Sequence, residues 1–188
     1  IAQRLAQQFF ISSKIWPVSM SFTVAIVGRP NVGKSTFFNR LIGRKKSIVD
    51  DISGVTRDRI YDIADWNGKT FTVIDTGGFV PGSADVFESG IRRQVELAIS
   101  EAHCILFMTD AMTGVTDLDM AMAELLRKTR KPVFLVVNKV DNHNRQLLAQ
   151  EMWSLGFKEL FCISSISGSG TGELLDAIAA LVSTPPPD

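Results

Sequence analysis

Residues 23–35 read TVAIVGRPNVGKS, an apolar run followed by the pattern GxxxxGK[ST]. The run 23–27 is rich in β-branched residues and predicts a buried strand, and the periodicity of 34–43 predicts a helix. Between them, Gly28 and Gly33 allow a tight turn whose N–H groups point at phosphate oxygens, and the helix N-terminus adds the positive end of its dipole. The stretch therefore predicts a phosphate-binding loop for a nucleoside triphosphate.

Each side chain at the end of this loop has a predicted role in binding the nucleotide. We expect Lys34 to reach the β- and γ-phosphates and Ser35 Oγ to coordinate Mg²⁺. The loop alone does not identify the base or the reaction, because nucleotide kinases, ATPases and GTPases all use it. The residues expected to contact the nucleotide here are Gly28, Arg29, Pro30, Asn31, Val32, Gly33, Lys34, Ser35 and Thr36.

Short apolar runs alternate with longer amphipathic stretches along the chain. Asn67-Gly68 between two strand-like runs predicts a hairpin and one antiparallel pair, whereas strands separated by helices imply right-handed crossovers and parallel pairing. We therefore expect an α/β fold of three layers, with a mainly parallel six-stranded sheet and one antiparallel edge strand. The predicted strands cover 23–27, 58–66, 70–75, 103–109, 132–137 and 159–163, and the predicted helices cover 34–43, 84–101, 117–130, 143–155 and 171–182.

Composition narrows the class of protein. The 188 residues carry 20 Lys+Arg and 20 Asp+Glu, so the net charge is zero. The charge balance therefore gives no reason to expect non-specific binding to nucleic acid or to an anionic membrane. Two cysteines cannot build a disulfide scaffold, and we expect Cys104 and Cys162 to be small buried apolar side chains. The apolar runs are far shorter than the roughly 20 residues that cross a bilayer. We expect one cytoplasmic globular domain that has no contact with a membrane.

The two ends of the chain set the predicted domain bounds. Residues 1–19 contain no acidic side chain and are interpreted as upstream or added sequence, with a targeting segment or an extra helix as alternatives. The folded domain is predicted over 20–183, and a proline run places the start of a linker at 184–188. Residues 1–50 hold eight basic side chains and one acid, which indicates either a bound anion or a solvated basic helix end.

The tetrapeptide Asn138-Lys139-Val140-Asp141 directly follows an apolar strand, at the sheet edge where α/β proteins bind ligands. Guanine presents two adjacent donors, N1–H and the 2-amino group, and the Asp141 carboxylate can accept both, whereas adenine would leave it unpaired. Lys139 can lay its aliphatic stem across the base, and Asn138 can tie this segment to the phosphate loop. The alternative for Asp141 is the N-cap of the next helix.

Two glycine-containing segments are expected to sense the terminal phosphate. In Asp75-Thr76-Gly77-Gly78, Asp75 can hold Mg²⁺ through water, and Gly78 lets a backbone N–H approach the γ-phosphate. Upstream, we expect Thr56 to supply a second hydroxyl to Mg²⁺, with an ordinary strand start as the alternative. Both segments would be ordered by the γ-phosphate and loosened after hydrolysis.

Ser164-Ser165 follows the last predicted strand. A loop here can place backbone N–H groups against guanine O6, although serine-rich turns are common. We include both residues in the predicted nucleotide site.

Taken together, GRPNVGKS, Thr56, DTGG, NKVD and the Ser164-Ser165 loop resemble the five-motif pattern of translation-factor-related small GTPases. The amino-acid sequence of 28–40, 48–58 and 167–172 is similar to that of the first GTPase domain of the Der (EngA) family. Members of this family are bacterial proteins with two tandem GTPase domains and a KH-like domain. The resemblance covers about 22–181. One departure is Ser165, where the family usually has Ala.

This resemblance implies a P-loop G-domain fold and GTP as the substrate. It implies a role in assembly of the large ribosomal subunit, with that subunit and its rRNA as partners. It also implies that the second GTPase domain and the KH-like domain are missing from this chain.

Phe79 follows DTGG, where many GTPases carry the glutamine that orients the attacking water. Phe can neither donate nor accept that hydrogen bond. Relatives of Der with an apolar residue here use a bound K⁺ in place of an arginine finger, held partly by an Asn of the phosphate loop. The resemblance thus implies a K⁺ site at Asn31, with a plain turn residue as the alternative. The expected catalytic set is Lys34, Asn31, Thr56 and Gly78.

The favoured function is a Mg²⁺-dependent GTP-binding and GTP-hydrolysing switch. The alternative is a binding module gated by nucleotide, with negligible hydrolysis of its own. A P-loop nucleotide kinase has no support, because nothing in the sequence resembles an acceptor-binding lid.

Overall fold

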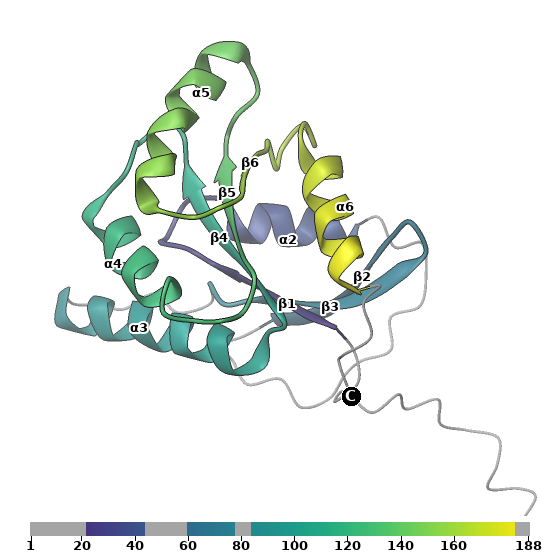
Figure 1. The fold of residues 1–188 in the computed structure, drawn as a ribbon, viewed down its shortest axis with the longest axis horizontal. Helices are drawn as coiled ribbons and strands as arrows, with labels where there is room; N and C mark the ends of the chain where they lie inside the picture. The colour runs from purple at the N-terminus through teal and green to yellow at the C-terminus, as the bar shows by residue number, and fades with distance from the viewer. Residues whose placement is uncertain (1–21, 44–59, 78–83, 183–188) are drawn as a thin grey trace, which may run out of the picture.

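The computed structural model describes residues 22–43, 60–77 and 84–182, with the side chains of Ile60 and 84–88 left out. One sheet of six strands lies between two layers of helices (Figure 1). The strands are β1 (Thr23–Val27), β2 (Ile60–Trp66), β3 (Lys69–Asp75), β4 (Cys104–Asp110), β5 (Val133–Asn138) and β6 (Leu160–Cys162). The helices are α2 (Lys34–Ile42), α3 (Ala84–Glu101), α4 (Asp117–Leu126), α5 (His143–Leu148), the 3₁₀ helix η2 (Ala149–Leu155) and α6 (Thr171–Val182).

The strand order β2-β3-β1-β4-β5-β6 confirms the predicted mainly parallel sheet with one antiparallel edge strand. β2 and β3 pair antiparallel with Trp66 opposite Lys69, so Asn67 and Gly68 form the two-residue turn. Their φ angles of 49° and 76° are both positive, as a type I′ hairpin requires.

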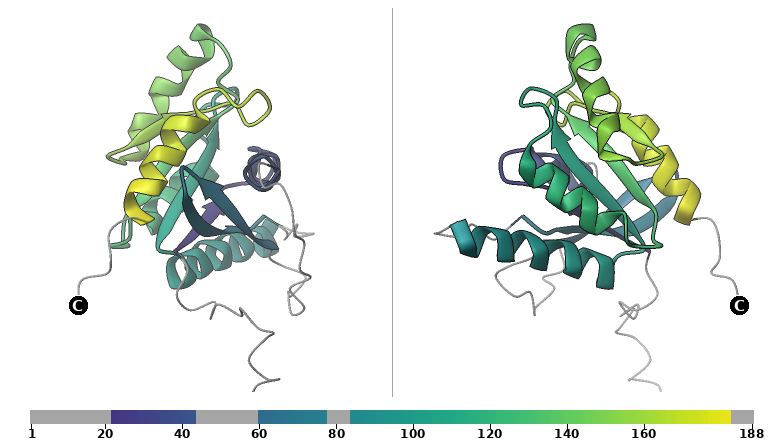
Figure 2. Two further views of the ribbon diagram at one scale, coloured as in Figure 1. Left: turned by 90° about the vertical axis from the view of Figure 1, so that its right-hand side faces the viewer. Right: turned by 60° about the vertical axis from the view of Figure 1, so that its left-hand side comes forward.

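The sheet separates two hydrophobic cores. One lies beneath α3, α4 and η2, and the other lies beneath α2 and α6 (Figure 2). β4 is buried at every position, because helices cover both faces of a central parallel strand. Cys104 lies in this strand, and burial raises the pKa of its thiol to about 12, whereas Cys162 is half-buried. Within the described residues, no helix is long and apolar enough to cross a membrane.

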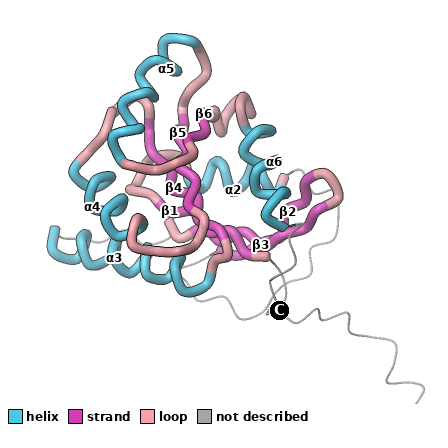
Figure 3. The backbone as a smooth tube through the Cα atoms, viewed as in Figure 1, coloured by secondary structure: helices cyan, strands magenta, loops and turns pink. Residues whose placement is uncertain are grey.

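Two predicted helices differ from the structure. The helix predicted over 117–130 ends at Leu126. The N–H groups of Lys128 and Thr129 then donate to carbonyl oxygens three residues earlier, which is the tighter 3₁₀ bonding found at many helix ends. The helix predicted over 143–155 begins as α5, which is labelled in Figure 3. From Ala149 to Leu155 it is a 3₁₀ helix. Its buried residues Ala149, Met152 and Leu155 recur every third position, which matches three residues per turn rather than 3.6.

The topology gathers loops at one edge of the sheet. β1 lies between β3 and β4, so the chain leaves β1 at the point where the strand order reverses direction. Ligands of open α/β sheets bind beyond the carboxyl ends of the strands at such a point. The loops that follow β1, β3, β4, β5 and β6 all start from this edge.

Candidate functional site

The phosphate loop, residues 28–33, connects β1 to the first turn of α2. Gly33 precedes the helix with φ 100°, a left-handed value that favours glycine. A Cβ added to Gly33 would lie 2.2 Å from Asn138 Nδ2. The close approach of Asn138, the last residue of β5, therefore requires glycine at this position.

Lys34 is buried at the N-terminus of α2. Its Nζ donates to the carbonyl oxygens of Gly28 at 2.7 Å and Arg29 at 2.8 Å. Burial lowers the pKa of the Lys34 ammonium from its ordinary 10.5 to about 8, partly offset by the Asp75 carboxylate and reinforced by Arg29. Within the described residues, the hydrogen bonds of this partly desolvated ammonium go to neutral carbonyls, so it is prepared to bind an anion.

Ser35 and Asp75 meet across the start of α2 and the end of β3. Ser35 Oγ donates to Asp75 Oδ2 at 3.0 Å, and Asp75 Oδ1 accepts from the Gly77 N–H at 2.9 Å. A hydroxyl and a carboxylate are oxygen donors of the kind that Mg²⁺ binds. The donor set therefore fits the predicted Mg²⁺ site.

Other predicted residues are placed differently. The Thr76 hydroxyl donates to the Ile26 carbonyl at 2.6 Å inside the sheet, so its side chain is used in the fold. Thr56, Gly78 and Phe79 lie outside the described residues, as do the predicted prefix and linker.

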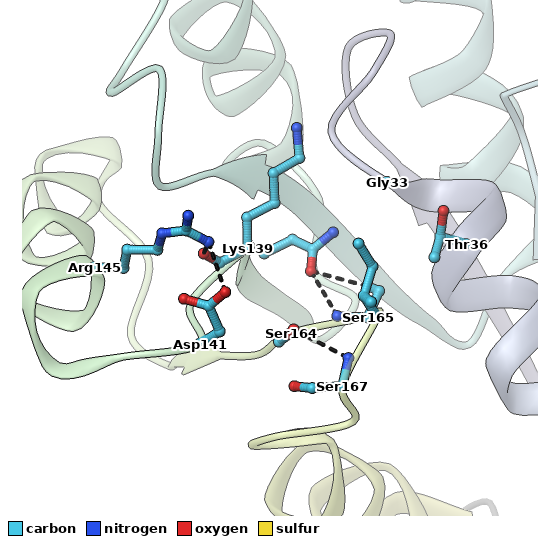
Figure 4. A pocket seen from close by; sticks show the side chains of 10 residues that line it. Gly33, Thr36, Lys139, Asp141, Arg145, Ser164, Ser165 and Ser167 are labelled. Atoms are coloured by element: carbon cyan, nitrogen blue, oxygen red, sulfur yellow. Dashed lines mark hydrogen bonds and ion pairs between the residues drawn. The ribbon is translucent and has the colours of Figure 1, made fainter.

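A cavity of about 210 Å³ opens beside the phosphate loop (Figure 4). In the figure, Thr36 of α2 lies on one side and the Asp141–Arg145 pair on the other. The lining residues are Gly33, Thr36, Asn138, Lys139, Asp141, Arg145, Ser164, Ser165, Ile166 and Ser167.

Asn138 joins three segments of the site. Its Nδ2 donates to the Val32 carbonyl at 2.8 Å, which is the predicted tie to the phosphate loop. Its Oδ1 accepts from the Ser165 N–H at 2.9 Å and from the Ser165 hydroxyl at 3.0 Å. The Ser164 N–H donates to Ser169 O. Since both predicted amides have partners within the protein, their contact with guanine O6 stays a prediction.

Lys139 lines the cavity with its stem and reaches the phosphate loop with its ammonium. Nζ lies 2.5 Å from Asp110 Oδ2 and donates to the Asn31 carbonyl at 3.0 Å. Asp110 is buried at the end of β4. These contacts fix the Lys139 stem beside the cavity.

Asp141 faces the cavity with an exposed carboxylate. Oδ2 pairs with Arg145 Nη1 at 2.8 Å, and Oδ1 accepts from Asn142 Nδ2 at 2.9 Å. The N-cap of α5 is Asn142, whose side chain accepts from the Arg145 N–H. The alternative interpretation of Asp141 as the N-cap is therefore wrong, and its carboxylate is directed to the cavity.

Comparison with known proteins identifies the family. The family model described as 50S ribosome-binding GTPase matches residues 23–139. This chain belongs to the 50S ribosome-binding GTPase family. The match includes the phosphate loop, the segment after β3, and Asn138 and Lys139, the first two residues of the tetrapeptide that begins at the end of β5.

Relatives of this GTPase family member include GTPase Der of Christiangramia forsetii, which is 61% identical over 85% of this chain and 37% of that protein. The chain thus spans little more than a third of the length of the curated relatives that it matches. The predicted resemblance to the Der family is confirmed.

Solved structures of GTPases share the fold. A single-residue variant of Aquifex aeolicus Era bound to GDP·AlF₄⁻ matches with a TM-score of 0.68 and 31% identity, over 90% of this chain and 59% of that one. Era in complex with MgGDPNP and nucleotides 1506–1542 of 16S ribosomal RNA matches with a TM-score of 0.67 and 30% identity, over 89% and 58%.

The structure of this GTPase family member adds residues that the sequence did not reveal. Among the residues predicted to contact the nucleotide, Arg29 directs its side chain to the buried Asp119 at 3.3 Å and to Thr113, two partners that no motif indicated. Arg40 donates to the Ser165 and Ile166 carbonyls. A sequence signal existed for Arg145 alone, because it lies four residues after Asp141.

Proposed function

We propose that this chain binds GTP with Mg²⁺ and hydrolyses it to GDP and phosphate, as the GTPase domain, over about 20–183, of a factor for large-subunit assembly. One observation carries the proposal: the cavity lined by Asp141 opens beside the phosphate loop. The Asn138–Val32 hydrogen bond of 2.8 Å joins the two parts. A base and its phosphates can therefore occupy both parts at once.

Recognition of guanine is assigned to the cavity. The Asp141 carboxylate accepts N1–H and the 2-amino group, and its pair with Arg145 holds the carboxylate in place from outside the base. A carboxylate offers about four lone-pair sites, so guanine and Arg145 can share it. The Lys139 stem covers one face of the base.

The phosphates are assigned to the loop and α2. The N–H groups of 31–36 and the Lys34 ammonium bind phosphate oxygens, and Ser35 with Asp75 would hold Mg²⁺, Asp75 through a water. Bound Mg²⁺ neutralises charge on the phosphate oxygens. For Thr56, as a second Mg²⁺ ligand, and Gly78, as a donor to the γ-phosphate, the proposal rests on the motifs.

Hydrolysis of GTP against ATP tests the function directly. The purified 188-residue chain with Mg²⁺ is expected to release phosphate from GTP and at least about a hundredfold more slowly from ATP, because adenine leaves the Asp141 carboxylate unpaired. Phosphate release is measured under single-turnover conditions. Binding of GTP without release would favour the nucleotide-gated module, and equal rates with ATP would contradict guanine selection.

The monovalent cation gives a second prediction. Phe79 stands where a water-orienting glutamine is common, so another group must supply part of the positioning and charge stabilisation that catalysis needs at the γ-phosphate. If a K⁺ ion held by Asn31 supplies it, turnover is faster in KCl than in NaCl at matched ionic strength, by about tenfold or more. Asn31 is exposed in the phosphate loop with φ 66°, and its backbone carbonyl already accepts from Lys139.

Asn31→Ala is the variant that isolates this ion, with Asn39→Ala, exposed on α2, as its control. We expect the first to lose the difference between KCl and NaCl and the second to keep it. Equal wild-type rates in the two salts would exclude the K⁺ mechanism.

The partners are proposed on the resemblance to Der. The large ribosomal subunit and its rRNA are the proposed partners of the full-length protein, in the cytoplasm and away from membranes. The second GTPase domain and the KH-like domain would belong to the part of such a protein that this chain does not include.

A further inference from the structure

Gln94 of α3 makes hydrogen bonds to two nucleotide-binding segments at once. Its Oε1 accepts from the Gly28 N–H at 3.1 Å, at the start of the phosphate loop. Its Nε2 donates to the Thr76 carbonyl at 2.9 Å, in the segment that follows β3. The side chain is half-buried, and neither the motifs nor the proposed mechanism uses it.

These two contacts close a ring of interactions around Lys34. Lys34 Nζ donates to the carbonyl of Gly28, and the N–H of Gly28 donates to Gln94. Gln94 holds Thr76, and Thr76 is followed by Gly77, which lies so near to Lys34 that an added Cβ would be 2.7 Å from its Cε. The ring thus connects the ammonium that meets phosphate to the segment beside Asp75.

A side-chain amide satisfies both needs of this geometry. The Gly28 N–H needs an acceptor and the Thr76 carbonyl needs a donor, and Gln offers both on one planar group. A carboxylate has no donor in its ionised form and would place negative charge against the Thr76 carbonyl. Glu at this position therefore keeps the contact with Gly28 and breaks the contact with Thr76.

We propose that Gln94 is a positioning residue that couples the phosphate loop to the segment after β3, and so sets the preference of the site for GTP over GDP. This inference rests on the proposed function. GDP occupies the loop and Lys34, whereas the third phosphate of GTP also needs the segment after Asp75 in place. A link that holds this segment against the loop favours the triphosphate selectively.

The test compares the affinities for GDP and GppNHp, both with Mg²⁺, by calorimetry on the full 188-residue chain. Gln94→Glu is expected to lower the ratio of GppNHp affinity to GDP affinity about fivefold, the factor for one lost hydrogen bond. The uncharged Gln94→Met, which loses both hydrogen bonds, is expected to lower this ratio at least as much. If the ratio falls in the uncharged variant as well as in the charged one, repulsion between a carboxylate at position 94 and the phosphates is excluded as the cause. Glu96→Gln, exposed on the same helix, changes charge without touching the ring and is expected to keep the wild-type ratio.

A ratio within about twofold of wild type in both Gln94 variants would overturn this inference and leave the proposed function intact. Failure of the wild-type chain to bind either nucleotide would overturn the proposed function, and this inference with it. If neither variant folds, hydrogen exchange of the wild-type chain decides: GppNHp is expected to protect amides 91–98 of α3 at least about threefold more than GDP does, and equal protection would contradict the coupling.

Discussion

Asp141→Asn is expected to weaken GDP binding by about a hundredfold or more and to create a site for xanthine nucleotides. In the proposed site, this carboxylate is the group that accepts both N1–H and the 2-amino group of guanine. Hydrogen bonds to a charged group contribute about 1.5–3 kcal/mol each, and about 3 kcal/mol in total corresponds to more than a hundredfold. Asn presents its Nδ2 donor to the 2-amino group, where two donors then face each other.

Xanthine removes this clash between two donors, because it carries a carbonyl acceptor at C2 in place of the 2-amino group. The side-chain amide of the Asp141→Asn variant can accept from N1–H and donate to that carbonyl, so XDP binding is expected to exceed GDP binding in the variant. Calorimetry with GDP, XDP and ADP measures the change. Asp117→Asn, an exposed carboxylate at the start of α4, serves as the charge-matched control. A loss of less than about threefold for GDP would show that Asp141 does not recognise guanine.

The fold could be predicted from local patterns because each element carries its own signal. The hairpin followed from Asn67-Gly68, whose positive φ angles few other pairs adopt without strain. The alternation of strands and helices then fixed parallel pairing for the rest of the sheet. The C-terminal end of α4 and the 3₁₀ geometry of η2 were not predicted, because tertiary packing rather than propensity decides them.

The candidate site was only partly predictable, for a related reason. Motifs give backbone geometry and the groups near the ligand, and the contacts of Asn138, Ser35 and Asp75 agree with them. The partners that hold those groups lie far away in sequence: Asp110 is 29 residues from Lys139, and Gln94 is 66 residues from Gly28. No periodicity connects such pairs, so the supporting layer of the site appears only in three dimensions.

Lys34→Met is expected to reduce GTP hydrolysis by about a hundredfold or more while leaving a folded chain. Removing one positioned donor that meets developing charge typically costs a factor of about 100 to 1,000 in turnover. Met has a similar length and no charge, and the burial that lowers the Lys34 pKa to about 8 shows that this environment disfavours an ammonium. Single-turnover phosphate release measures the loss, and thermal unfolding without nucleotide checks the fold. Lys128→Met, exposed beyond α4, is expected to hydrolyse GTP at the wild-type rate.

The pH dependence of GTP binding separates a charged role of Lys34 from a steric one. Without nucleotide the pKa is about 8, and phosphate anions raise it, because an opposite charge favours the protonated form. Below about pH 8 the amine is already charged and binding takes up no proton. Above about pH 8 binding must protonate it, so wild-type affinity falls with rising pH, by at most about tenfold per unit. Lys34→Met lacks this group, and the difference in affinity between the two proteins is expected to narrow from about pH 8 to about pH 9.

Proton uptake, measured by calorimetry in buffers of different ionisation enthalpy, should be present at about pH 8.5 in the wild-type chain and smaller in the variant. Equal uptake in both would mean that Lys34 does not meet the phosphates as an ammonium.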